Sequence, residues 1–169
     1  MRISKAKTLI LEKGMLPQRE SKKNAGFAWF RSLSEIISEL KTHTEKELID
    51  LVKQRINGLQ LLRNTLGDKT IDDQQLGGYE LFNEADNLFE NCIAKKEEIN
   101  NLLKPIFNTE VFSLKENGFN FQNIKNQYSF NQFEGQIDTG KMMESLLKKA
   151  LLKGIKILNN VFVEGITAQ

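Results

Sequence analysis

The sequence predicts an α/β fold, in which short strands are combined with long amphipathic helices. An apolar, β-prone run at residues 8–11 is closed by a Glu-Lys-Gly sequence, which predicts a buried strand followed by a turn. Two capping boxes, beginning at Ser32 and Thr44, each open an apolar pattern with helical spacing. Alternating apolar residues over 155–163 indicate a further strand near the C-terminal end.

The central helices are predicted from spacing and caps. After the second capping box, apolar residues recur every three or four positions as far as Leu66, and Gly67 is suited to end that helix. The next helix is expected to begin at a cap formed by Asn83 and to end at Pro105, because proline removes a helical hydrogen-bond donor. The two helices present apolar stripes that need a partner surface.

An Asn- and Phe-rich stretch follows, and it predicts short strands near residues 111–114 and 127–130. Another strand is expected at 77–82, entered through a pair of glycines. The phenylalanines are expected to be buried in sheet and cap contacts. A last helix is predicted from Asp138, acting as its N-cap, to Gly154.

Composition excludes several classes of function. The 169 residues include 24 basic and 22 acidic side chains, a net charge of +2 that is too balanced for a nucleic-acid-binding protein. No run approaches the roughly 20 apolar residues that cross a bilayer, so no membrane segment is expected. The length suits one ordinary domain.

The single cysteine and the single histidine indicate no metal site. Cys92 cannot form an intramolecular disulfide, which favours a cytoplasmic location, and its place in an apolar helical stripe predicts a buried packing residue. His43 is expected to be an exposed residue between two helices. Cysteine and histidine ligands are too few for a zinc site.

Three segments carry a resemblance to a known family. Residues 8–14 read TLILEKG, residues 21–27 read SKKNAGF, and residues 134–143 read EGQIDTGKMM. In this order they resemble the flavin-dependent amino-acid and amine oxidoreductases of the D-amino-acid oxidase, glycine oxidase and sarcosine oxidase superfamily. The resemblance implies FAD as cofactor, a small amine or amino-acid substrate, and oxidation of a C–N bond by hydride transfer to the flavin.

The resemblance also implies a domain organisation. It predicts a partial FAD-binding Rossmann-like domain with an inserted α+β substrate-domain segment. Residues 1–31 would supply the ribose-binding strand and flavin loop, residues 32–133 a helical excursion and part of the substrate-binding domain, and residues 134–169 the return to the FAD-binding domain. In the return segment, Gln136 and Asp138 are expected to have structural roles.

Candidate cofactor contacts come from the same segments. Dinucleotide-binding folds place an acid after their second strand, where it hydrogen-bonds the ribose, and Glu12 has that place. The small residues of the following loop let backbone approach a ligand, and a lysine there adds positive charge. The expected cofactor-binding residues are Glu12, Lys13, Ser21, Lys23, Asn24, Ala25 and Gly26. The alternatives are a surface acid after an edge strand and a helix-entry turn at residues 24–26. No catalytic residue is assigned.

The family's G-x-G-x-x-G motif does not occur in this sequence. The resemblance therefore predicts a fragment that lacks the pyrophosphate cradle and the C-terminal half, and that is inactive by itself. Unpaired strand edges would leave it marginally stable or rescued by self-association.

Two other functions remain open. The apolar stripes of helices 44–66 and 84–103 suit a non-catalytic helical interaction protein. A NAD-binding Rossmann-like enzyme piece is also consistent with Glu12, because an acid favours a ribose over a 2′-phosphate.

Overall fold

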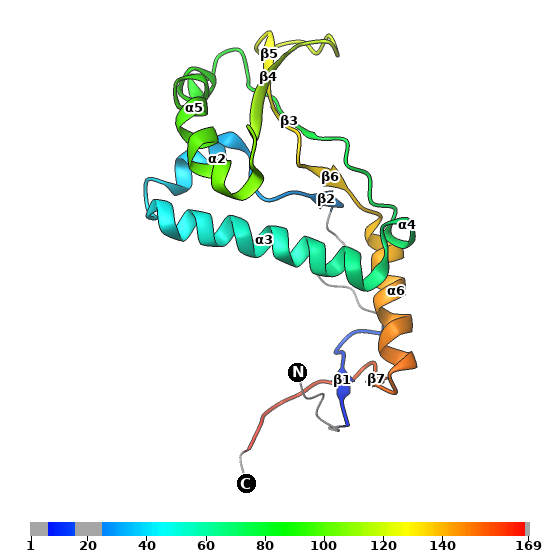
Figure 1. Ribbon diagram of the computed structural model, residues 1–169. Helices are drawn as coiled ribbons and strands as arrows, with labels where there is room; N and C mark the ends of the chain where they lie inside the picture. Colours follow the sequence, from blue (N-terminus) through cyan, green and yellow to red (C-terminus); the bar gives the residue numbers. More distant parts are fainter. Residues whose placement is uncertain (1–6, 16–24, 168–169) are drawn as a thin grey trace.

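The computed structural model describes residues 7–15 and 25–167. Figure 1 shows a larger body of helices and sheet at one end of helix α6 (Thr139–Leu152) and a small strand pair at the other end. The pair consists of β1 (Leu9–Leu11) and β7 (Lys156–Leu158), which run parallel with Ile10 opposite Ile157. Helix α6 therefore links the β1–β7 pair to the larger body.

The helices of the larger body begin and end largely where local signals predict. They are α2 (Leu33–Glu39), α3 (Glu45–Leu66), α4 (Asp68–Ile71) and α5 (Leu88–Phe107). Both capping boxes are formed, because the side chains of Ser32 and Thr44 accept the N3 backbone N–H and the N3 glutamates accept the N-cap N–H. Gly67, at φ 88°, ends α3 as predicted.

A three-stranded antiparallel sheet packs against these helices. Its order is β3 (Gly78–Glu80), β5 (Gln127–Asn131) and β4 (Phe112–Glu116), so the strands predicted here are confirmed. A second, two-stranded pairing joins β2 (Phe27–Ala28) to β6 (Gly135–Gln136). This pairing brings the segment before α2 next to the segment before α6.

The core lies between α2, α3, α5 and the near face of the sheet. Its fully buried members include Leu33, Val52, Ile99 and Phe112. Cys92 is also buried there, as predicted, and burial raises the pKa of its thiol to about 12.

Buried Asn100 joins α5 to the sheet. Its side-chain oxygen accepts the N–H groups of Val111 (3.1 Å) and Phe112 (2.9 Å), and its amide donates to the Phe112 carbonyl (2.9 Å). These three bonds satisfy polar groups that would otherwise be buried without partners.

The terminal strands differ from their prediction. Leu9, Ile10 and Leu11 form the predicted strand but are 50%, 42% and 41% exposed, so the prediction of a buried strand is wrong. Among the described strands β1 pairs with β7 alone, which leaves its apolar faces open. The predicted C-terminal strand stops at Leu158, because Asn160 turns the chain with φ 60°.

Both predicted ends of α5 are also wrong. Asn83 caps a turn instead, accepting the N–H of Ala85 (3.0 Å), and the helix begins five residues later. Pro105 lies inside the last turn, where it removes one hydrogen bond without ending the helix. The end comes at Asn108, in the left-handed conformation (φ 59°).

The phenylalanines are divided between core and surface. Phe112 is buried and Phe107 and Phe133 are packed against the core, but Phe119 and Phe121 are exposed, so the prediction of general burial is only partly correct. His43 is exposed, as predicted. In residues 7–15 and 25–167, no helix has both the length and the apolar character that crossing a membrane requires.

Candidate functional site

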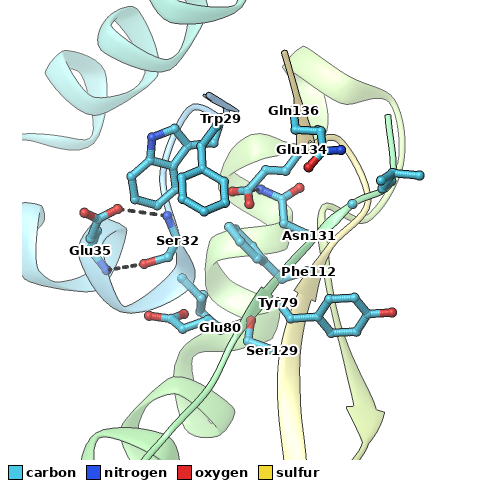
Figure 2. A pocket seen from close by; sticks show the side chains of 16 residues that line it. Trp29, Ser32, Glu35, Tyr79, Glu80, Phe112, Ser129, Asn131, Glu134 and Gln136 are labelled. Carbon is cyan, nitrogen blue, oxygen red and sulfur yellow. Dashed lines mark hydrogen bonds between the residues drawn. The ribbon is translucent and has the colours of Figure 1, made fainter. Parts of the chain in front are cut away.

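A cavity of about 600 Å³ lies where β2, β6 and the start of α2 meet the three-stranded sheet. Figure 2 shows the side chains that line it, including Trp29 and Gln136 from the β2 and β6 segments, and Tyr79, Glu80 and Phe112 from the sheet. A volume of this size accommodates a small organic ligand. The cavity joins segments that are far apart in the sequence.

One wall of the cavity is aromatic and apolar. Trp29 and Phe27 lie on it with ring centroids 6.3 Å apart, and both are partly exposed. Leu76 extends the apolar surface, and buried Phe112 lines the interior. These groups can contact a hydrocarbon chain and exclude water from it.

Three carboxyl groups line the same cavity. They belong to Glu35 of α2, Glu80 of β3 and Glu134 at the turn before β6. Burial raises the pKa of Glu134 to about 7, a hydrogen bond from Asn131 opposes this, and the charges of Glu80 and Glu35 raise it further. Glu134 can therefore be either protonated or ionised near neutral pH.

The local backbone explains the position of Glu134. The Asn131 side chain accepts the Phe133 N–H (3.0 Å) and donates to Glu134 Oε1 (2.9 Å), so it orients the carboxyl. Gly77 donates its N–H to the Glu134 carbonyl (2.8 Å). Gly78 carries no Cβ, and the Glu134 carboxylate occupies the space that a Cβ would take.

The other two carboxylates have structural partners. Glu80 accepts hydrogen bonds from the Ser34 hydroxyl and from the Ser34 N–H (3.3 Å). Glu35 accepts the Ser32 N–H (3.0 Å) and lies 3.5 Å from the Arg31 guanidinium. Of the three, Glu134 is the carboxyl for which no described residue supplies either a hydroxyl or a cation.

The predicted ribose acid lies at the end of β1. The Glu12 N–H donates to the Leu158 carbonyl (2.9 Å), and its Oε1 accepts the Gly14 N–H (2.9 Å). The Lys13 ammonium lies 4.7 Å from the centre of the Phe162 ring. Glu12 thus follows a strand of a parallel pair, the position at which dinucleotide-binding folds place their ribose-binding acid.

The predicted flavin loop is described only at its end. Ser21, Lys23 and Asn24 lie outside the described residues, and Ala25 is exposed. Gly26 is buried with φ 86°, and a Cβ there would meet the Ile137 carbonyl oxygen. A glycine is thus required at position 26, because the backbones of Gly26 and Ile137 approach each other closely.

Residues of the return segment have the structural roles predicted for them. Asp138 caps α6 by accepting the Lys141 N–H (2.9 Å). Gln136 exchanges two backbone hydrogen bonds of 2.9 Å with Gln74, which fixes β6 beside the chain before β3. The cavity wall formed by β6 is therefore held from both sides.

The cavity was not predicted from the sequence. Glu134 stands in the predicted return segment, but Glu35 and Glu80 come from distant parts of the chain and reach it only through the β2–β6 and β3–β5 pairings. The available signal was Gly78, whose missing Cβ permits the close approach of the carboxyl.

Comparisons with known proteins define the fold. No family model and no curated protein matches the sequence. Among solved structures, L-amino acid deaminase from Proteus myxofaciens superposes with a TM-score of 0.65 at 18% identity, over 96% of this chain and 35% of that chain. Glycine oxidase from Bacillus cereus gives 0.60 at 15% identity, over 96% and 43%.

A second L-amino acid deaminase, from Proteus vulgaris, gives a TM-score of 0.57 at 17% identity, over 96% of this chain and 40% of that chain. The chain thus spans 35–43% of the length of these three proteins. At these identities the similarity shows the fold, which agrees with the resemblance found in the sequence. This chain has the fold of a part of those amino-acid oxidoreductases.

Proposed function

We propose that this chain forms part of an FAD-dependent oxidoreductase that oxidises a C–N bond of an amino acid or amine by hydride transfer to flavin. The observation that carries the proposal is the fold match over 96% of the chain to an L-amino acid deaminase and to glycine oxidase. A cavity of substrate size, lined by carboxyl and aromatic groups, supports it.

The described residues fit the ribose end of the cofactor. In the proposal Glu12 hydrogen-bonds the ribose, with Lys13 beside it. The same proposal assigns the loop residues Ser21, Lys23, Asn24, Ala25 and Gly26 as contacts to the flavin and its pyrophosphate. When bound, FAD supplies the hydride acceptor, and the chain supplies groups that bind and orient it.

The spacing of these groups agrees with an extended dinucleotide. Glu12 lies by β7, just beyond the C-terminal end of α6, and Gly26 contacts Ile137 before the N-terminal end of the same helix. A 14-residue helix is about 21 Å long. Residues at the two ends of α6 would therefore hold the ribose end and the flavin end of the same FAD molecule.

The cavity is the proposed substrate region. The proposal assigns residues 32–133 to a helical excursion and part of the substrate-binding domain, residues 1–31 to a partial FAD-binding domain, and residues 134–169 to the return to that domain. The apolar wall of the cavity would exclude water from the substrate, and the carboxyl groups would hold the polar end of the substrate. Catalysis belongs to the complete enzyme, and this chain alone is expected to be inactive.

Flavin content tests the proposal. The native polypeptide that contains this sequence, isolated from its source cells, should show flavin absorbance, and Glu12→Gln should weaken FAD binding. Glu98→Gln is a matched control, since Glu98 is an exposed α5 residue remote from β1. A native polypeptide that binds no flavin would refute the proposal, and stabilisation by NAD but not FAD would select the NAD-binding alternative.

The apolar stripes of α3 and α5, which suggested an interaction protein, supply Leu48, Val52, Ile99 and Leu103 to the core. An exposed apolar surface near the C-terminal end favours this second, non-catalytic candidate instead. Leu152 and Ile166 are 88% and 92% exposed, and Leu151 and Phe162 lie exposed on the same C-terminal segments. Self-association through this surface and the β1–β7 edges is the expected behaviour of the isolated chain. Sedimentation measures it, and a stably folded monomer without flavin affinity would support the interaction protein.

A further inference from the structure

The cavity has an unbalanced charge. Its walls carry the carboxyl groups of Glu35, Glu80 and Glu134, and no lysine, arginine or histidine of the described chain lines it. Arg31, 3.5 Å from Glu35, offsets part of this charge. The remaining carboxyl groups would repel a ligand that entered with a carboxylate first and would attract a cation. The negative charge of the walls therefore favours a ligand that enters with a positively charged end.

Glu134 is the carboxyl with unused binding capacity. Among the described residues, its side-chain hydrogen bond comes from the neutral Asn131 amide (2.9 Å), whereas Ser34 donates to Glu80 and Ser32 donates to Glu35. A half-buried carboxylate without a cation is costly, and proteins usually pair such a group. A bound ligand that brings its own positive charge would supply the missing partner.

The aromatic wall suits the rest of such a ligand. Trp29 and Phe27 present partly exposed rings to the cavity, and Leu76 extends the surface. Figure 2 shows the Trp29 side chain and the Glu134 carboxyl lining the same cavity, from the β2 and β6 segments. Methylene groups can pack on this wall, and an ammonium gains from a nearby aromatic face.

We propose that this cavity binds an aliphatic ammonium group, with Glu134 as its counter-ion and the Trp29 wall against its alkyl chain. The substrate of the oxidoreductase would then enter with its ammonium end against residues 129–136. That a substrate is the ligand rests on the proposed function, whereas the binding of an ammonium group does not.

Trp29 provides the measurement, because it is the single tryptophan of the chain. Titrating the full chain at about pH 8 with butylamine should change its fluorescence saturably, since Glu134 is ionised there. Butanol and butyrate are the probes of similar size without a positive charge. Neither should produce a saturable change.

Glu134→Gln should weaken butylamine binding by about tenfold or more, the expected loss for a charge-assisted contact. The amide keeps an oxygen that can accept from Asn131, so the fold should persist, which circular dichroism checks. Gly78→Ala is the second variant, since its Cβ would displace the Glu134 carboxylate without removing its charge. Exposed Glu98→Gln should leave binding unchanged.

The inference is overturned by absence of saturable butylamine binding, by equal binding of butanol, or by unchanged affinity in both cavity variants. The flavin content of the native polypeptide separates this outcome from failure of the proposed function. If the native polypeptide contains flavin but the chain binds no amine, the ammonium site is refuted and the proposed oxidoreductase stands. If the chain binds the amine but the native polypeptide contains no flavin, the ammonium site stands and the assignment of its ligand as a substrate is refuted.

Discussion

Replacing Glu134 by glutamine should stabilise the protein above neutral pH. Burial raises the pKa of this carboxyl from its ordinary 4.5 to about 7 in the folded state. Between these values the folded protein keeps a proton that the unfolded chain has released, so the free energy of unfolding falls as pH rises from about 4.5 to about 7. Glutamine has no such titration and retains an acceptor for Asn131.

The magnitude follows from the same shift. Each pH unit between 4.5 and about 7 corresponds to about 1.36 kcal/mol, which gives an upper bound of about 3.4 kcal/mol. Because Glu134 is only half-buried, solvent screening reduces this, and we expect about 1–2 kcal/mol. For a chain of this size that corresponds to a rise in Tm of roughly 2–8 °C.

Urea unfolding, followed by circular dichroism at about pH 5 and about pH 8, measures the effect. The wild-type protein should lose stability between the two pH values, and Glu134→Gln should lose less. Glu98→Gln serves as the control, because its exposed side chain should leave the pH dependence unchanged. A Glu134→Gln protein that is less stable than wild type at the higher pH would refute the reasoning.

Three further predictions concern the fold. Gly26→Ala should cost at least about 2 kcal/mol in urea unfolding, because its positive φ and the Ile137 carbonyl leave no room for a Cβ, whereas Gly58→Ala, on an open helical surface, should be neutral or stabilising. Cys92 should resist a thiol reagent at about pH 8 until urea unfolds the protein, since burial raises its pKa to about 12; rapid labelling of the native chain would contradict this. Asn100→Ala should lower stability by roughly 2–4 kcal/mol by leaving backbone groups of Val111 and Phe112 without partners, and a loss below about 0.5 kcal/mol would disprove the anchoring role.

Elements specified within a few residues were predicted well. The capping boxes at Ser32 and Thr44 and the N-cap at Asp138 depend on contacts three residues apart, so the sequence alone reveals them. The start of α5 was missed because Asn83 has two local uses, and the sequence does not show that the turn prevails. The exposure of β1 depends on which strands lie beside it, information that no local pattern contains.

The candidate site residues also differ in how far the sequence predicts them. Glu12 was found because an acid after a short apolar strand is a local pattern, and the structure places it at the end of β1. Whether it contacts a ribose remains a prediction. The environment of Glu134 could not be predicted, because Glu35 and Glu80 approach it only after α2 and the sheet have assembled.

The pairing of β1 with β7 has a consequence for the order of folding. It joins Ile10 to Ile157, two residues far apart in the sequence. Closing a loop of that length in the unfolded chain would cost about 4 kcal/mol of conformational entropy. Three pairs of exposed residues stabilise the native state by less than this cost. Once the body has folded, the contact between Gly26 and Ile137 already holds the intervening chain together. The terminal strands should therefore join last and separate first, and their amide hydrogens should exchange with solvent while those of α5 are still protected.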